Sequence, residues 1–291
     1  MKRAMDHQDP DRIVDLREAR LGDHICVGYD DDRFFRRTAT EFFAAGIEAS
    51  ERVGFFAPPP KLAELTAWLS ASGIDVNRLA SRGQIVLGDV SAAYLPDGAF
   101  DPKRRIESFS ASIDEALADG FTGFRVIGDV ASIMDRQDVR AEWLSYELRA
   151  DLLAARKPIA ALCSFDHRVC PEQVALEAAA VHSYRYGDVA EPPPFRIVAG
   201  AGAGLRIEGE IDFGSATSVA KLLLNASEDA APAIDVSDLA FIDAAGMRAL
   251  ASGAVALLQR HPGVQIRGGS QIFKRMWDLM GLDRFETIAV R

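Results

Sequence analysis

The chain of 291 residues is 48% hydrophobic and 26% charged, which is typical of globular proteins with hydrophobic cores, and its length favours two domains over one. The formal net charge of −10 at pH 7 argues against a general nucleic-acid binder, because such a protein needs a basic face to neutralise phosphates. The sequence shows neither a secretory signal nor a run of about eighteen apolar residues, and its three cysteines suit a reducing compartment. We therefore expect a cytoplasmic protein that contacts neither nucleic acid nor membrane.

Residues 1–19 are polar and of mixed charge, and we expect them to form an N-terminal arm. From residue 20 to residue 190, short apolar runs alternate with segments whose apolar residues recur at helical spacing. This alternation predicts a mostly parallel sheet that is covered by helices on both faces. The expected strands are 23–29, 52–57, 84–87, 123–128 and 158–165, and the expected helices are about 34–47, 61–72, 104–118, 139–156 and 171–182.

A second domain is expected from residue 195 to residue 291, after a proline-rich boundary at 191–194 that cannot continue a helix. Apolar segments on both sides of a glycine-rich run predict a β-hairpin at its start. The expected strands are 195–198, 205–208, 234–242 and 264–267, and the expected helices are about 215–225, 244–260 and 272–280. The prediction is a small α/β domain.

The turn after strand 234–242 is the most informative segment of the second domain. Asp243 stands at an N-cap position, where a side-chain oxygen can accept hydrogen bonds from the free amides of a helix. Met247 and Leu250 then recur at helical spacing. We expect Asp243-Ala-Ala-Gly246 to lie at an exposed helix N-terminus, which suits a docking surface.

A parallel α/β domain raises the question of phosphate binding, but the sequence contains no G-x-x-x-x-G-K-[ST] motif. Gly28-Tyr-Asp-Asp-Asp32 follows the first predicted strand, and its three carboxylates would repel a triphosphate. The G-x-S-x-G motif of a nucleophilic serine is also missing. We expect no enzymatic activity and assign no catalytic residue.

Histidine and cysteine residues raise the alternative of a metal site. His24 and Cys26 share one face of a strand, and Cys163 and His167 lie in or after the fifth predicted strand. These four residues could serve a metal, haem or redox sensor, or a degenerate enzyme. Because there is no C-x-x-C or H-x-x-x-H pair and buried free cysteines are common, we favour structural cysteines and predict no metal and no cofactor.

Ligands of open α/β sheets bind beyond the carboxyl ends of the strands. Three predicted strands end there in aspartate-containing turns, with aromatic and histidine side chains nearby. Each aspartate could instead cap the following helix, but together they predict a polar mouth for a small ligand. The predicted ligand-binding residues are His24, Tyr29, Asp30, Asp129, Asp166 and His167.

The first domain resembles the MEDS (DcmR-type) sensory domain over about residues 20–188. The resemblance rests on Gly22-Asp-His-Ile-Cys26, Tyr29-Asp30, Gly128-Asp129 and Leu162-Cys-Ser-Phe-Asp166, followed by Pro171 and His182. It implies a core similar to RecA and KaiC that lacks a working P-loop. It also implies sensing of small molecules, often proposed to be hydrocarbon derivatives, and fusion to a signalling output domain.

The second domain resembles STAS domains, the family of anti-sigma-factor antagonists. The resemblance rests on Phe241-Ile-Asp243 followed by two small residues and a glycine, on Gly209-Glu-Ile-Asp212 and on Leu279-Met-Gly-Leu-Asp283. It implies binding to an anti-sigma factor with kinase activity, which phosphorylates a serine just before the motif glycine. That position is Ala245 here, so this chain cannot be phosphorylated there. The predicted partner interface is Asp243, Ala244, Ala245, Gly246 and Met247.

The two resemblances together predict a regulator of signal transduction and transcription, in which small-molecule sensing controls partner binding by the STAS domain. The expected partner is an anti-sigma-factor-like kinase or another signalling protein. A scaffold that forms homodimers without sensing any ligand is the remaining alternative.

Overall fold

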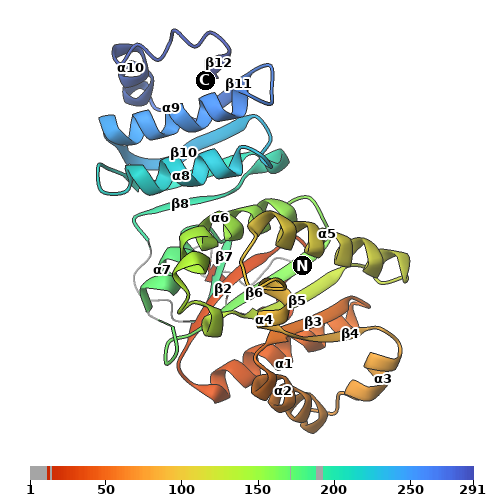
Figure 1. Cartoon of the computed structure of the whole chain (residues 1–291). Coiled ribbons are helices and arrows are strands. Elements are labelled where there is room, and N and C mark those ends of the chain that lie inside the picture. Colours follow the sequence, from red (N-terminus) through yellow and green to blue (C-terminus); the bar gives the residue numbers. More distant parts are fainter. Residues whose placement is uncertain (1–11, 14, 171, 188–192) are drawn as a thin grey trace.

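The computed structural model of the protein describes residues 12–13, 15–170, 172–187 and 193–291. These residues form two α/β units, each built on its own sheet (Figure 1). Within the described part of the chain, no helix is long and apolar enough to cross a membrane. The fold class expected from the sequence, a mostly parallel α/β domain followed by a small α/β domain, is confirmed.

The first unit contains a seven-stranded sheet whose described pairings are all parallel, in the order β1-β7-β2-β6-β5-β3-β4. The five strands predicted from the sequence are present, and two short strands, β1 and β7, extend the sheet at one edge. The strands are β1 (Arg12–Ile13), β2 (His24–Tyr29), β3 (Arg52–Ala57), β4 (Ile85–Asp89), β5 (Phe124–Asp129), β6 (Ile159–Asp166) and β7 (Tyr184–Tyr186).

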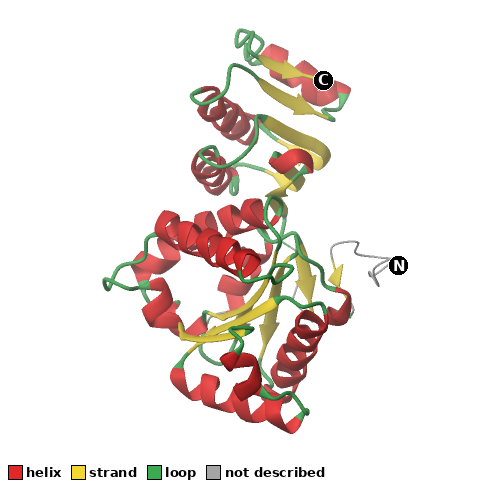
Figure 2. Ribbon diagram, turned by 90° about the vertical axis from the view of Figure 1, so that its right-hand side faces the viewer, coloured by secondary structure: helices red, strands yellow, loops and turns green. Residues whose placement is uncertain are grey.

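Helices cover both faces of this sheet, as the ribbon view shows (Figure 2). One hydrophobic core lies under α1 and α2, and a second lies under α5, α6 and α7. The sequence did not predict the short helices α3 and α4. The helices are α1 (Asp32–Glu48), α2 (Pro59–Ala71), α3 (Val76–Ser81), α4 (Val90–Tyr94), α5 (Pro102–Ala118), α6 (Gln137–Ala154) and α7 (Glu172–Ala179), with 3₁₀ turns at Leu16–Glu18 and Ala131–Ile133.

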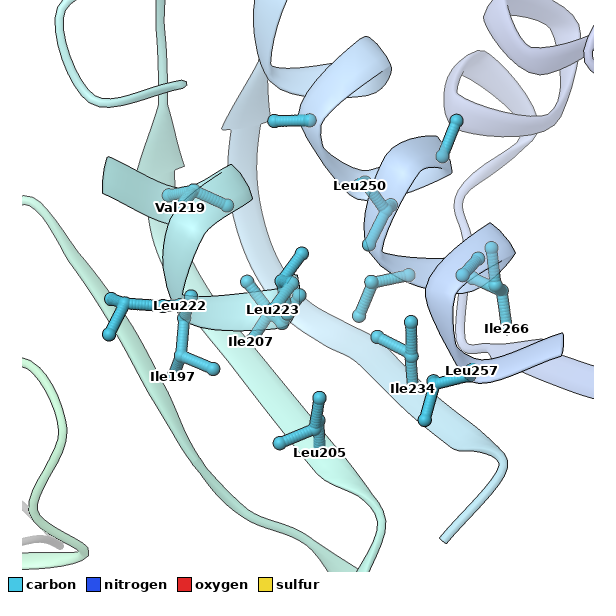
Figure 3. Packing of buried hydrophobic residues seen from close by; sticks show 14 of the residues in the cluster. Ile197, Leu205, Ile207, Val219, Leu222, Leu223, Ile234, Leu250, Leu257 and Ile266 are labelled. Carbon is cyan, nitrogen blue, oxygen red and sulfur yellow. The ribbon is translucent and has the colours of Figure 1, made fainter. Parts of the chain in front are cut away.

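The second unit has a five-stranded sheet in the order β12-β11-β10-β9-β8, in which only β8 and β9 pair antiparallel, as the predicted hairpin requires. Aliphatic side chains from the strands and from α8 and α9 interlock in its core (Figure 3). The elements are β8 (Phe195–Ala199), β9 (Leu205–Ile211), α8 (Ala216–Ala226), β10 (Ala233–Ile242), α9 (Ala244–Leu258), β11 (Val264–Arg267), α10 (Gln271–Leu279) and β12 (Ile288–Val290), with a 3₁₀ turn at Ala201–Ala203.

Helix α6 joins the two units. Its residues Trp143 and Tyr146 belong to the core of the first unit, whereas Leu148 and Leu152 are fully buried in the same hydrophobic cluster as Ile197 of β8. Figure 1 shows α6 between the seven-stranded sheet and the pair formed by α8 and β8. One helix therefore contributes to both hydrophobic cores.

Candidate functional site

The carboxyl ends of β2, β5 and β6 bring three of the predicted ligand residues together. The Tyr29 hydroxyl donates to Asp129 over 3.2 Å, and β2 pairs with β6 so that Tyr29 lies opposite Asp166. Lys61 of α2, which the sequence did not single out, places its Nζ 2.7 Å from Asp129 and 3.1 Å from Asp166. Its position follows from the prolines that start α2 just beyond the end of β3.

The charged groups at these strand ends pair with one another, two cations with three carboxylates. Arg168 donates two hydrogen bonds of 2.8 Å to Asp166 and also pairs with Asp32. Burial opposes ionisation of Asp166, but the hydrogen bonds from Arg168 and Lys61 lower its pKa to about 2. Burial raises the pKa of Asp129, an effect that Lys61 opposes. This strand-end cluster is an ion-pair network around Lys61, and its outer members, Arg168 and Asp32, reach solvent.

Two other predicted ligand residues lie at the margin of the strand-end cluster. Asp30 is exposed, and the neighbouring Asp31 provides the N-cap of α1 instead. His167 is half-buried, and its imidazole fills the space beside Gly28 that a Cβ atom would need. The glycine at position 28 therefore serves the close packing of a histidine ring.

His24 lies at the opposite end of β2, in a fully buried polar cluster with Glu147, Cys163 and His182. His24 Nε2 is 3.2 Å from Glu147 Oε2 and 3.5 Å from Cys163 Sγ. Cys163 Sγ is 3.4 Å from Glu147 Oε2, and His182 Nε2 is 3.6 Å from the same oxygen. We call these four residues the His–Glu–Cys–His cluster.

The structure divides the four residues that the sequence suggested for a metal or redox site. His24 and Cys163 meet in the His–Glu–Cys–His cluster, but His167 lies beyond the far end of β2, and Cys26 is not among the converging ligand atoms. Burial raises the pKa of the Cys26 thiol, as expected for an unreactive core cysteine. Glu147 and His182 complete the cluster in place of Cys26 and His167. Glu147 comes from α6 and His182 from the segment between α7 and β7, rather than from neighbouring strands.

Asp151 holds His24 in place, one helical turn after Glu147 on α6. Its carboxylate accepts from His24 Nδ1 over 3.2 Å, from both the amide and the hydroxyl of Ser183, and from the backbone amide of Ala199 over 2.6 Å. Burial opposes the charge on His24, but hydrogen bonds to Asp151 and Glu147 raise its pKa to about 9. Burial and the charge on His24 lower the pKa of His182 to about 4.

A cavity of about 270 Å³ lies between α4 and α5, where Arg105 is 6% exposed. The guanidinium carbon of Arg105 lies 3.9 Å from the ring centroid of Phe109 and 4.3 Å from that of Tyr94. Among the described residues, Nε and Nη2 of Arg105 have no hydrogen-bond partner. Aromatic faces attract this cation, yet two of its buried donors are unsatisfied.

The N-terminus of α9 has the geometry expected from the sequence. Asp243 is the N-cap and accepts from the amides of Ala245 and Gly246, both over 2.8 Å. Ala244 is exposed and Ala245 half-buried, whereas Gly246 and Met247 are buried inside the domain. The surface of the predicted partner interface is therefore formed by residues 243–245.

Comparisons with known proteins agree with both resemblances. Residues 23–183, more than half of the chain, match the family model described as the MEthanogen/methylotroph, DcmR Sensory domain (MEDS). Residues 198–289 match the model described as Mlab, STAS domain. No curated protein is significantly similar to the chain in sequence.

A solved structure with similarity to the chain is the crystal structure of the DUF1998 helicase MrfA bound to DNA and AMPPNP. The alignment has 13% sequence identity and a TM-score of 0.34, and it covers 92% of this chain and 39% of the helicase chain. The chain thus spans well under two thirds of that protein, and a likeness this low carries no argument about function. By the match over more than half of its length, the chain belongs to the MEDS family, and a STAS domain follows its sensory domain.

Proposed function

We propose that the protein is a non-enzymatic signalling regulator, in which a small molecule bound by the MEDS domain controls partner binding by the STAS domain. The observation that carries this proposal is the position of α6, which belongs to the core of one domain and contacts the other. A change in the packing of α6 would alter both domains.

Polar contacts accompany the apolar part of this domain contact. Arg149 of α6 donates to Asp229 over 2.7 Å, to Glu228 over 2.9 Å and to the carbonyl of Asn225 over 3.1 Å. On the same helix, Asp151 accepts from the amide of Ala199 in β8. Directional contacts of this kind favour one docked arrangement, and a ligand can shift that arrangement only if it binds two arrangements with different affinities.

The cavity beside Arg105 is the ligand site that the geometry supports best. Removing a cation from water costs several kcal/mol unless it gains partners. The guanidinium of Arg105 lies against the rings of Phe56, Tyr94 and Phe109, and two of its donors have no acceptor among the described residues. The cavity is also lined by Arg104 and by Asp101, so the charges there are two cations and one carboxylate. A carboxylate or phosphate would supply the missing acceptors for the Arg105 guanidinium. The volume of about 270 Å³ is near the lower limit of small-molecule pockets, so the proposed ligand is a small organic anion.

The aromatic cluster next to this cavity offers a route to α6. Tyr94 lines the cavity, its hydroxyl lies 3.3 Å from that of Tyr146, and its ring lies 5.9 Å from that of Trp143. Phe100 packs on both α6 rings, with centroids 5.6 Å and 5.4 Å away. An anion that draws Arg105 outward would release its contact with Tyr94 and let these rings repack.

The proposed output is binding of an anti-sigma-factor-like kinase or another signalling protein at residues 243–245. Ala245 replaces the serine that the STAS resemblance implies, so no phosphate can be added there. A phosphate at the N-terminus of α9 would be electrostatically favourable and would block a partner by charge and bulk. Because phosphorylation cannot control the STAS domain at this position, control falls to the MEDS domain, whose helix α6 contacts α8 and β8.

The test is calorimetric titration of the full chain with a panel of small carboxylates and phosphate esters. We expect at least one to bind, and Arg105→Met to weaken that binding by tenfold or more, while Arg36→Met, an exposed arginine on α1, leaves it unchanged. Hydrogen exchange with the bound anion should then change amide protection in β8 and α8. Binding without any such change, or binding unaffected by Arg105→Met, would contradict the proposal.

A further inference from the structure

The His–Glu–Cys–His cluster contains unsatisfied polar atoms in the interior of the protein. All four side chains are buried, with exposures of 0% for His24, Glu147 and His182 and 7% for Cys163. Among the described residues, His182 Nε2 and Glu147 Oε1 have no hydrogen-bond partner. Buried polar groups without partners are rare, and each one requires an explanation such as an ion or a bound molecule.

Both histidines present the same nitrogen to the centre of the cluster. Nδ1 of His24 bonds to the Asp151 carboxylate, and Nδ1 of His182 lies 2.7 Å from the carbonyl oxygen of Ala178. Each acceptor fixes a proton on Nδ1, which leaves the Nε2 atom of the neutral ring free to coordinate. Carboxylate and carbonyl acceptors of this kind orient the histidine ligands of metal sites.

Four of the six separations between the ligand atoms match those of a tetrahedral coordination sphere. The four ligand atoms lie within 4.8 Å of one another, and the closest separations are 3.2–3.6 Å. With ordinary zinc–ligand bond lengths, adjacent ligands of a tetrahedral site are about 3.3–3.6 Å apart. The rings of His24 and His182 are stacked, with centroids 3.9 Å apart and planes at 21°, so at least one imidazole must turn before both Nε2 atoms can point at one ion.

We propose that His24, Glu147, Cys163 and His182 form a buried binding site for a divalent transition metal, with zinc as the best fit. Two imidazoles, a thiolate and a carboxylate are a donor set that suits zinc. The thiolate and carboxylate together carry two negative charges, which neutralise the ion in an interior where a net charge is costly. With four protein ligands and no exposed side, the site is of the structural rather than the catalytic kind.

Metal binding would replace two protons of the empty cluster. Without metal, the Nε2 proton of His24 lies between the ring and Glu147, and Cys163 is a thiol whose pKa is raised by burial and by Glu147. When the ion binds, one proton leaves His24 Nε2 and one leaves Cys163 Sγ, and both atoms then coordinate the ion. The competing explanation is that the cluster remains a histidine–carboxylate ion pair and holds no metal.

The test starts with the full chain, purified without chelators and also refolded with excess zinc. We expect elemental analysis to find one zinc ion per chain in either preparation. Cobalt(II) in place of zinc should give the intense visible absorption of a tetrahedral site and a thiolate-to-cobalt charge-transfer band. Cys163→Ser should abolish that band, and Cys26→Ser, a buried cysteine paired with Cys163 across the strands, should retain it.

The two explanations are separated even when a variant fails to fold, because the wild-type protein alone is sufficient. Metal well below one equivalent in both wild-type preparations would overturn the proposal, as would a cobalt complex without a charge-transfer band. A band that survives Cys163→Ser but is lost in Cys26→Ser would also overturn the assigned ligands. None of these results depends on the anion proposed for the cavity beside Arg105, so the two proposals stand or fall separately.

Discussion

Replacing Asp151 by asparagine should destabilise the whole chain, because this carboxylate joins three parts of the structure. Its two oxygens accept four hydrogen bonds, from His24, Ser183 and Ala199, and the side chain is 1% exposed. An asparagine of the same shape supplies only one acceptor oxygen. If the side-chain NH2 group of the asparagine faces Ser183 and Ala199, the serine hydroxyl can rotate so that its oxygen accepts a hydrogen bond. The backbone N–H of Ala199 then faces another donor and loses its acceptor.

The magnitude follows from these contacts. A buried donor without an acceptor costs about 1–3 kcal/mol, and losing a hydrogen bond to a charged group removes about 1.5–3 kcal/mol. Removing one partner from a buried ion pair costs about 3–5 kcal/mol. We therefore expect Asp151→Asn to lower the free energy of unfolding by about 3–5 kcal/mol.

Urea unfolding of the full chain, followed by circular dichroism, measures this loss. The matched control is Asp138→Asn, at the exposed start of the same helix, where the aspartate forms an ion pair with Arg136. Exposed ion pairs contribute about 0–1 kcal/mol, so the control should stay within that range. If Asp151→Asn costs no more than the control does, the four hydrogen bonds of Asp151 do not stabilise the fold.

Two further predictions concern single side chains. Gly246→Ala should destabilise the STAS domain by about 1–3 kcal/mol, because the new Cβ would lie 2.7 Å from Ile211 Cγ2 and 2.9 Å from the Ile211 carbonyl oxygen. Thermal unfolding measures this loss, and Ala244→Ser at an exposed position is the neutral control. Arg168→Gln should reduce the loss of unfolding free energy that the wild-type protein shows as pH falls below about 4. The folded-state pKa of Asp166 is lowered from 3.8 to about 2, so its stabilisation is present above about pH 4 and is lost as pH falls towards 2. Urea unfolding midpoints at pH 6, 4 and 3 measure this pH dependence. If the midpoint changes equally with pH in the variant and the wild type, Arg168 does not lower the pKa of Asp166.

Local patterns in the sequence were sufficient for most of the fold. The apolar runs of β2, β3, β5 and β6 and the periodic helices between them are encoded over short stretches, and Asp243 marks the start of α9 directly. The short elements β1, β7 and β12 lack such patterns, because each has only two or three residues. Tertiary pairing, rather than local preference, makes them strands.

The candidate sites were predictable only in part, because each combines distant segments. The strand-end rule located Tyr29, Asp129 and Asp166, but Lys61 reaches them from a helix that follows a different strand. Sequence spacing also grouped His24 with Cys163, yet it could not reveal that Glu147 enters from the middle of α6. The amphipathic pattern of a helix does not distinguish a buried glutamate beside a histidine from one in solvent. Only the packing of α6 on the sheet does.

The position of Leu148 and Leu152 in the STAS core has a consequence for any outside partner. Helix α6 is tethered to the surface that it covers, and short tethers give an effective local concentration in the millimolar range. A protein directed at the same face of α8 must outcompete this intramolecular occupant and would lose apparent affinity accordingly. Ala244 is exposed, so among the described residues a protein directed at it meets no such competitor. The covalent link to α6 therefore weakens binding of partners at α8 and leaves binding at Ala244 unaffected.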